Sequence, residues 1–296
     1  MSTVYIFGSG ASKYTGIPIT HNFLDTVINE KIASSALDVD CSKEKVGYEL
    51  PNDFHRPFLE RFEKFKKVSM STSIETYLNW YTEQNYSDEY DRQLMQMIVW
   101  YFYDRSHHAS TIRFHDLFVT KIFKPEDIII SFNYDLIIED ALINNGYKAR
   151  NGARYGEVYV KDEFECQLLK PMGSVNLHSY DKDKGFTDSI YWANGYVEVS
   201  YIKYVMKWFG IPRDVYSSVY IKCNEKIKSA DKVVSLGYAF PQTDKEELDI
   251  IFNNCTKEID LVCGKDFIAP WTKTITYKNQ SVSFEEWVLR ETGLNK

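Results

Sequence analysis

The chain has 296 residues and an acidic balance, with 35 lysine and arginine side chains against 42 aspartate and glutamate side chains and a formal net charge of −7. This balance disfavours a nucleic-acid partner, because such partners are bound through a dense cationic face. No uncharged run approaches the ~20 residues that cross a bilayer, and the start has no basic segment followed by an apolar core. We therefore expect no membrane contact and a cytoplasmic location.

The five cysteines lie far apart in the sequence and form no C-x-x-C pair. Structural zinc sites and redox dithiols are typically built from such pairs. We therefore expect free thiols and no metal site.

The chain opens on TVYIFGSGAS, a β-rich run that is broken by glycines. ITHNFLDTVINE follows, with the apolar spacing of a helix. Strand, glycine loop and helix in this order are typical of the first unit of a doubly wound nucleotide-binding sheet.

Residues 35–125 have a different sequence pattern, with apolar residues at helical spacing and charged residues between them. PFLERFEKFKK, SIETYLNWYTEQ and YDRQLMQMIVWYFYDRS show the pattern most clearly. We interpret 35–125 as a helical insertion within a single domain that spans 1–296. Its histidines, His107, His108 and His115, are expected on a solvated helical face.

Apolar runs return after the insertion. DIIISFNYD predicts a strand buried on both faces, and LIIEDALINNG predicts the following helix, with Gly146 past its end. Residues 150–200 predict hairpins or loops around the site, and a helix is expected near 213–229. DKVVSLGYAF then predicts a strand, TDKEELDIIFNNC a helix, and EIDLVCG the last parallel strand. Together these elements predict an α/β fold, a Rossmann-like doubly wound parallel sheet with a helical insertion.

Four predicted strand ends are polar or rich in glycine: GSGAS at 8–12, SFNYD at 131–135, MGS at 172–174 and GYAFPQTD at 237–244. In a parallel sheet, ligands collect where loops leave the carboxyl ends of strands. The glycines of 8–12 would let backbone N–H groups approach a diphosphate. The loop is neither a Walker loop nor a strict G-x-G-x-x-G, and an ordinary tight strand–helix turn is the alternative.

Read together, GSGASKYTGIP, SFNYD, KPMGS and SLGYAFPQTD resemble motifs of the sirtuin-like NAD-binding family, especially the bacterial sirtuin-like NAD-cleaving domains of antiphage defence systems. The match covers both ends of the chain in the right order. The helical block and the 180–210 loops match no motif of this family.

The resemblance implies a role for each matched residue, and NAD or ADP-ribose as the ligand. The diphosphate would be held by the first loop, which comprises Gly8, Ser9, Gly10, Ala11 and Ser12. Gly16 and Pro18 would shape the loop over the nicotinamide ribose, while Ser174 and Gly237 would approach the ribose and the adenosine. Asn133 would orient a water molecule or the ribose at the breaking bond, and Asp135 would bind the nicotinamide carboxamide. For this pair, turn formation by Asn133 and helix capping by Asp135 are the alternatives.

One departure from the family concerns its catalytic histidine, in whose position this chain has Met172. A thioether accepts no proton at neutral pH and is a weak hydrogen-bond acceptor. Two histidines could replace it: His178, which follows Met172 closely in sequence, and His21, which lies just past the G-I-P loop. A surface or core position is the alternative for each. The sirtuin Asp-Phe-Arg and zinc ribbon are also absent, which disfavours protein deacylation.

The sequence thus predicts an NAD hydrolase (NADase) of a bacterial antiviral defence type, in which catalysis is weak or lost. One alternative is a non-catalytic sensor of NAD or ADP-ribose that acts through a protein partner or a homo-oligomer. A structural subunit with a relic pocket is the other.

Overall fold

The computed structural model describes most of the predicted βα units and part of the predicted helical block. The described residues are 1–17, 24–26, 55–70, 74–84, 102, 106, 111–149, 159–160, 167–173, 177–181, 185–188, 213–240, 244–264 and 275–294. The chain divides into two compact units. One comprises Met1–Ile17, Arg105–Asp188 and Lys203–Lys296, and the other comprises Pro18–Asp104 and Ser189–Ile202.

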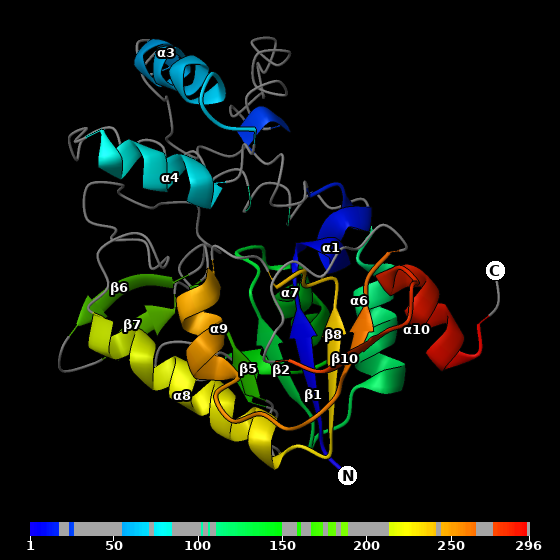
Figure 1. The fold of residues 1–296 in the computed structure, drawn as a ribbon. Coiled ribbons are helices and arrows are strands. Elements are labelled where there is room, and N and C mark those ends of the chain that lie inside the picture. Colours follow the sequence, from blue (N-terminus) through cyan, green and yellow to red (C-terminus); the bar gives the residue numbers. More distant parts are fainter. Residues whose placement is uncertain are drawn as a thin grey trace. The chain divides into compact units, whose positions relative to one another are not determined.

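A parallel sheet forms the centre of the first unit (Figure 1). Its strands, in chain order, are β1 (Thr3–Phe7), β2 (Ile128–Ser131), β5 (Gln167–Leu169), β8 (Lys232–Leu236), β9 (Ile259–Val262) and β10 (Tyr277–Asn279). The spatial order is β10-β9-β8-β1-β2-β5, and every neighbouring pair is parallel. Numbered within the sheet, this is the 3-2-1-4-5-6 order of a Rossmann-like, doubly wound sheet. The predicted fold class is confirmed.

Helices cover both faces of this sheet (Figure 1). α8 (Arg213–Ser229) and α9 (Lys245–Ile251) lie on one face. The other face carries α6 (Arg113–Leu117), the π-helical turn η3 (Phe118–Ile122), α7 (Ile137–Asn144) and α10 (Phe284–Thr292). Each β1 residue from Val4 to Phe7 is buried, because successive side chains of a strand point to opposite faces and both faces are covered.

The predicted strands and helices of this unit are present, and the hairpin expected within 150–200 is formed by β6 (Leu177–Asp181) and β7 (Gly185–Asp188). A second short antiparallel pair joins β3 (Lys148–Ala149) to β4 (Tyr159–Val160). One expectation was wrong: EIDLVCG, which contains β9, is followed by a further parallel strand, β10. The three residues of β10 are half-buried or exposed, so they lack the apolar run that marks the other strands.

An aromatic cluster fills the core between the sheet and α6, η3 and α10. Tyr5 and Phe7 from β1 pack edge-to-face on Phe118, and Phe7 also packs on Phe284. His115 lies in this cluster, buried, with its Nδ1 2.8 Å from the Tyr14 hydroxyl. The expected solvated position of His115 was therefore wrong: α6 turns this residue toward the rings, and burial lowers the pKa of His115 to about 3.

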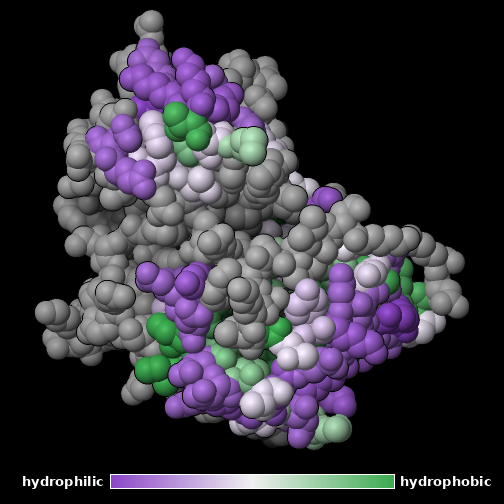
Figure 2. Space-filling view, viewed as in Figure 1, coloured by the Kyte–Doolittle hydropathy of each residue, from purple (hydrophilic) through white to green (hydrophobic). Residues whose placement is uncertain are grey.

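Hydrophilic residues cover most of the visible surface of α10 (Figure 2). The buried positions of this helix, Phe284, Trp287 and Val288, recur at the three-to-four-residue spacing of a single face. Cys223, Cys255 and Cys263, the cysteines within the described ranges, are free thiols, as predicted. Within those ranges, no helix combines the length and the apolar character that a bilayer crossing requires.

The second unit contains α3 (His55–Lys66) and α4 (Ile74–Glu83). They pack through an aromatic cluster that comprises Phe62, Phe65, Tyr77, Trp80 and Tyr81. These are two of the helices that the apolar spacing predicted. The bounds 35–125 for an insertion within one domain remain a prediction.

Candidate functional site

The ends of β1 and β8 lie next to each other at the point where the strand order reverses. Strands β1 and β8 pair in parallel from Thr3↔Lys232 to Phe7↔Leu236, so the loops that follow them leave the sheet side by side. Such a switch point is where open α/β sheets bind their ligands. The glycine loop of residues 8–12 and the loop that begins at Gly237 both start there.

Close backbone contact between these two loops explains three of the glycines. A Cβ on Gly8 would lie 2.4 Å from the Tyr238 Cα, and one on Gly10 would lie 2.8 Å from the Gly237 oxygen. Gly237 has φ +67, and a Cβ there would lie 2.2 Å from the Ala11 nitrogen. The loops can approach so closely only because neither carries a side chain at these positions.

Several backbone amides of the glycine loop already have partners within the protein. The Gly8 N–H donates to Leu236, the Gly10 N–H donates to Gly237 at 3.0 Å, and the Ala11 N–H donates to Gly8. α1 (Ser9–Ser12) is a single turn, and the 3₁₀ turn η1 (Lys13–Thr15) continues it. Ala11 and Ser12 are buried, whereas Ser9 and Gly10 are partly exposed. A ligand at this loop would therefore meet Ser9 and Gly10 first.

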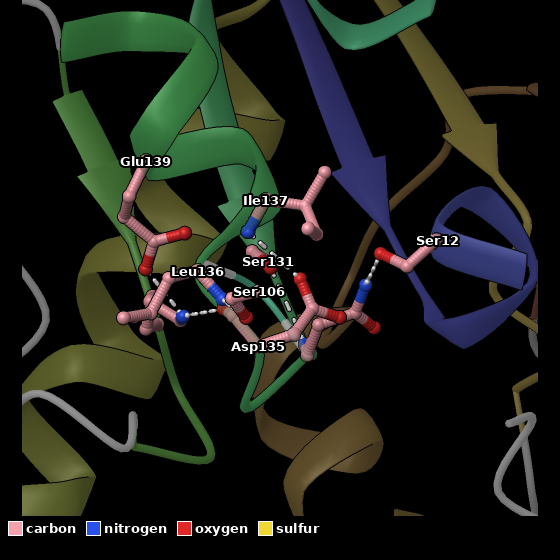
Figure 3. Close-up of polar contacts among 9 residues, drawn as sticks. Ser12, Ser106, Ser131, Asp135, Leu136, Ile137 and Glu139 are labelled. Carbon is pink, nitrogen blue, oxygen red and sulfur yellow. Dashed lines mark hydrogen bonds and ion pairs between the residues drawn. The ribbon is translucent and has the colours of Figure 1, made fainter. Parts of the chain in front are cut away.

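The loop after β2 brings Asn133 and Asp135 to the glycine loop. The Asn133 Nδ2 donates to the Ser12 Oγ at 3.1 Å, although 121 positions separate the two residues. Figure 3 shows Ser12 and Asp135 facing each other from their two loops. The Asp135 Oδ1 accepts the Ile137 N–H at 3.1 Å, at the start of α7. The N-cap residue of α7 is Leu136, so Asp135 lies one position before the cap and accepts the first N–H of the helix, which leaves it beside Ser12 and Asn133.

Two further contacts hold this loop in place. The Phe132 N–H donates to the Phe7 carbonyl at 2.9 Å. The Leu136 N–H donates to the Ser106 Oγ at 3.1 Å, as Figure 3 shows. The Phe132 ring also stacks on Tyr238, with centroids 4.1 Å apart. The ends of β1, β2 and β8 therefore form one buried polar and aromatic cluster.

A buried lysine and two further acids lie next to Asp135. The Lys170 Nζ is 2.5 Å from the Glu139 Oε1 and donates to the Asp135 carbonyl at 2.8 Å. Burial raises the pKa values of Asp135 and Glu139, and the nearby Lys170 ammonium opposes the rise in both. Burial, together with the charges of Glu139 and Asp135, raises the pKa of Asp140 to about 7.

Met172 lies in the turn that follows β5. The Gly173 N–H donates to the Lys170 carbonyl at 3.0 Å, which closes a β-turn with Pro171 at its second position. Gly173 has φ +89, and Met172 is 4 % exposed. The turn starts from the strand beside β2, so Met172 lies on the same edge of the sheet as Asn133 and Asp135.

The remaining predicted site residues divide between described and undescribed positions. Gly16 ends η1 in the left-handed conformation, with φ 91, and its N–H donates to the Lys13 carbonyl. Pro18, Ser174 and His21 lie outside the described residues, as do His107 and His108. For His178 the structure describes only the backbone, in β6.

Sequence reasoning missed several residues of the site: Ser106, Phe132, Lys170, Glu139 and Tyr238. Two of them had a signal. Glu139 interrupts the apolar run of LIIEDALI, and Lys170 follows the apolar end of β5 directly. A charge in such a run needs a partner when the segment is buried. Within the described residues, no group of three or more histidine, cysteine or acidic side chains could hold a metal ion.

Comparison with known proteins adds structural likeness alone. No protein-family model matches the chain, and no curated protein matches it. Among solved structures, a Sir2 homologue mutant in complex with 2'-O-acetyl ADP ribose is similar at 15 % identity and a TM-score of 0.47, over 100 % of this chain and 94 % of that one. A structure described as the structural basis for the mechanism and regulation of Sir2 enzymes is similar at 14 % identity and a TM-score of 0.46, over 99 % and 92 %. A complex of Sir2 with a p53 peptide and NAD+ is similar at 13 % identity and a TM-score of 0.42, over 99 % of this chain and 94 % of that one. Likeness at this level identifies no ligand or activity, which must come from the residues of the site.

Proposed function

We propose that this chain is a sirtuin-like NAD hydrolase of the bacterial defence type, which binds NAD at the carboxyl edge of its sheet and cleaves the nicotinamide–ribose bond. The observation that carries the proposal is the hydrogen bond between Asn133 and Ser12. It joins the two polar strand ends whose motifs resemble the family, next to the switch point where such sheets bind ligands.

In this proposal the diphosphate lies against Ser9 and Gly10, the partly exposed positions of the first loop. Cleavage passes through an oxocarbenium-like sugar, so it requires a held leaving group and a positioned water more than a strong base. The Asn133 amide uses its nitrogen on Ser12, and its oxygen accepts a hydrogen from the water or the ribose. The Asp135 carboxylate accepts the amide hydrogens of the nicotinamide. Asp135 is 2 % exposed, and such burial strengthens its electrostatic contacts.

Met172 favours a second candidate function, that of a sensor which binds NAD or ADP-ribose without cleaving it. The residue provides no group that accepts a proton at this edge of the sheet. A sensor would transmit binding through a protein partner or through a homo-oligomer.

The experiment is to incubate the purified chain with NAD and to measure the nicotinamide released. We expect slow release, and we expect Asn133→Ala to reduce it about 100-fold, because a misplaced reacting group costs about that much. Asn145→Ala is the matched control, since it also removes an amide with hydrogen bonds but lies beyond the end of α7. Binding of ADP-ribose without any nicotinamide release would favour the sensor, and equal release by the Asn133 variant and the parent would contradict the proposed site.

A further inference from the structure

Lys170 is a fully buried lysine at the end of an apolar strand. Its side chain has 0 % exposure, and the residues before it, Leu168 and Leu169, are also fully buried. Removing an ammonium group from water costs several kcal/mol even after the protein relaxes. An apolar residue at this position would avoid that cost, so the contacts of the ammonium should explain why a lysine is present.

The ion pair with Glu139 does not explain it. Replacing a buried ion pair with well-packed apolar residues often leaves the stability of a protein unchanged or raises it. The presence of such a pair is therefore weak evidence that the lysine is there for stability. Among the residues that the structure describes, none bonds to the Glu139 Oε2, which makes the pair incompletely satisfied. The contact that an apolar pair would lose is the one from Lys170 to the backbone.

That backbone contact falls within the functional loop. The Lys170 Nζ donates to the carbonyl of Asp135 at 2.8 Å, across 35 positions of sequence. The peptide that follows this carbonyl carries the Leu136 N–H, which is held by Ser106 from another segment. Lys170 and Ser106 thus fix the two ends of one peptide group. A peptide held at both ends cannot rotate, so the side chain of Asp135 keeps its direction toward Ser12 (Figure 3).

Lys170 also links the loop to the sheet and to α7. It follows β5, which pairs with β2 up to Ile130↔Leu169, so it begins beside the strand end from which Asn133 and Asp135 emerge. Glu139, its ion-pair partner, lies in α7 and directs the ammonium toward the start of that helix. The position of the ammonium is therefore set by elements that do not depend on the loop itself.

We propose that Lys170 is a positioning residue, whose ammonium group holds the Asp135 carbonyl and thereby orients Asn133 and Asp135 toward the bound ligand. The ligand part of this statement rests on the proposed function. The structural part, that Lys170 holds residues 132–137, does not.

Two variants separate positioning from charge balance. Lys170→Met with Glu139→Leu removes both charges, so no unpaired buried charge remains, but the contact with the Asp135 carbonyl is lost. Glu139→Gln is the matched control, because it keeps Lys170 on the carbonyl and still offers it an oxygen, while Asp135 and Asp140 remain as nearby acids that balance the ammonium. Hydrogen exchange of the amides of 132–137 is measured without ligand, and the amides of α10 serve as the internal reference.

We expect 132–137 to exchange at least about tenfold faster in the double variant than in Glu139→Gln, with α10 unchanged between them. Glu139→Gln should match the parent within about threefold in this segment. At saturating NAD, kcat for nicotinamide release should fall about tenfold per folded molecule in the double variant. A merely structural role would leave that kcat unchanged.

Equal exchange of 132–137 in the double variant and in Glu139→Gln would overturn the proposal. Loss of protection in Glu139→Gln alone would also overturn it, because the charge pair and not the carbonyl contact would then hold the loop. This comparison with the parent tests the proposal even if the double variant does not fold. If the parent itself neither binds nor cleaves NAD, the proposed function fails, and the exchange measurements still decide the role of Lys170.

Discussion

At the scale of single residues, Asn133 and Asp135 each take part in contacts that serve the fold as well as the proposed site. Asn133 bonds to Ser12, and Asp135 accepts the N–H of Ile137. A contact with the start of α7 and a contact with a ligand are therefore compatible roles for Asp135. One carboxylate oxygen accepts the first N–H of α7, and the side chain still faces Ser12 (Figure 3).

Met172→His tests whether the site lacks a base. Burial lowers the pKa of an imidazole, so a histidine at this position should be neutral and able to accept a proton near pH 7. We expect nicotinamide release to rise about tenfold, which corresponds to ~1.4 kcal/mol of barrier. Met172→Gln is the control, because it is polar and does not titrate. A folded, NAD-binding Met172→His variant with no gain over Met172→Gln would show that position 172 is not where a base is missing.

At the scale of elements, the contact between the glycine loop and the loop after β8 sets the architecture of the site. It also limits which substitutions can test ligand binding at the first loop. A side chain at Gly10 would strike Gly237 in the absence of any ligand, so a Gly10→Asp variant could lose binding through misfolding. Ser9, which is partly exposed, is the better position for such a test.

Gly237→Ala should be much more destabilising than Gly293→Ala. The two glycines have nearly the same φ, +67 and +69, but a Cβ on Gly237 meets backbone atoms of Gly10 and Ala11, whereas one on Gly293 meets nothing within 4 Å. The left-handed backbone alone costs a side chain about 1–2 kcal/mol, and overpacking adds about 1–3 kcal/mol at Gly237. Chemical denaturation measures both free energies of unfolding. Equal losses would show that the two loops do not pack as described.

Helix α7 carries the acids that couple stability to pH. The pKa of Asp140 is raised to about 7 in the folded chain, above the ~3.9 of an unfolded aspartate. The folded state then binds more protons than the unfolded state between these values, so this group lowers stability as pH rises from about 4 to about 7. Asp140→Asn should therefore raise the melting temperature relative to the parent more at pH 8 than at pH 5. Glu246→Gln, which removes an exposed acid of α9, controls for net charge. A gain that does not vary with pH would contradict the assignment.

At the scale of the whole molecule, much of the sheet could be predicted from the sequence. Strands buried on both faces appear in the sequence as continuous apolar runs. For this reason β1, β2, β8 and β9 could be predicted as strands. β10 was missed because its three residues carry no such run. α10 was missed even though Ser283 and Glu286 form a capping box and Gly293 ends the helix. In that case the local sequence does specify the helix.

The site was less predictable, because its contacts join residues that are distant in sequence. The motifs placed Asn133, Asp135 and the glycine loop at strand ends, where the structure brings them together. The pairing of Lys170 with Glu139 and Asp135 depends on β5 lying beside β2, which no local pattern specifies. The same holds for His115, whose burial depends on how α6 packs against β1.

The central claim is that NAD binds against the glycine loop at the switch point. Calorimetric titration of NAD into the parent, Ser9→Asp and Ser9→Asn tests it most directly, since the two variants differ in charge and hardly in size. A carboxylate near a diphosphate costs roughly 1–4 kcal/mol, and an acid in the first turn of α1 suits a helix start. We predict that the parent and Ser9→Asn bind NAD within a few-fold of each other and that Ser9→Asp binds at least about tenfold more weakly. No binding by the parent, or equal binding by both variants, would contradict the claim.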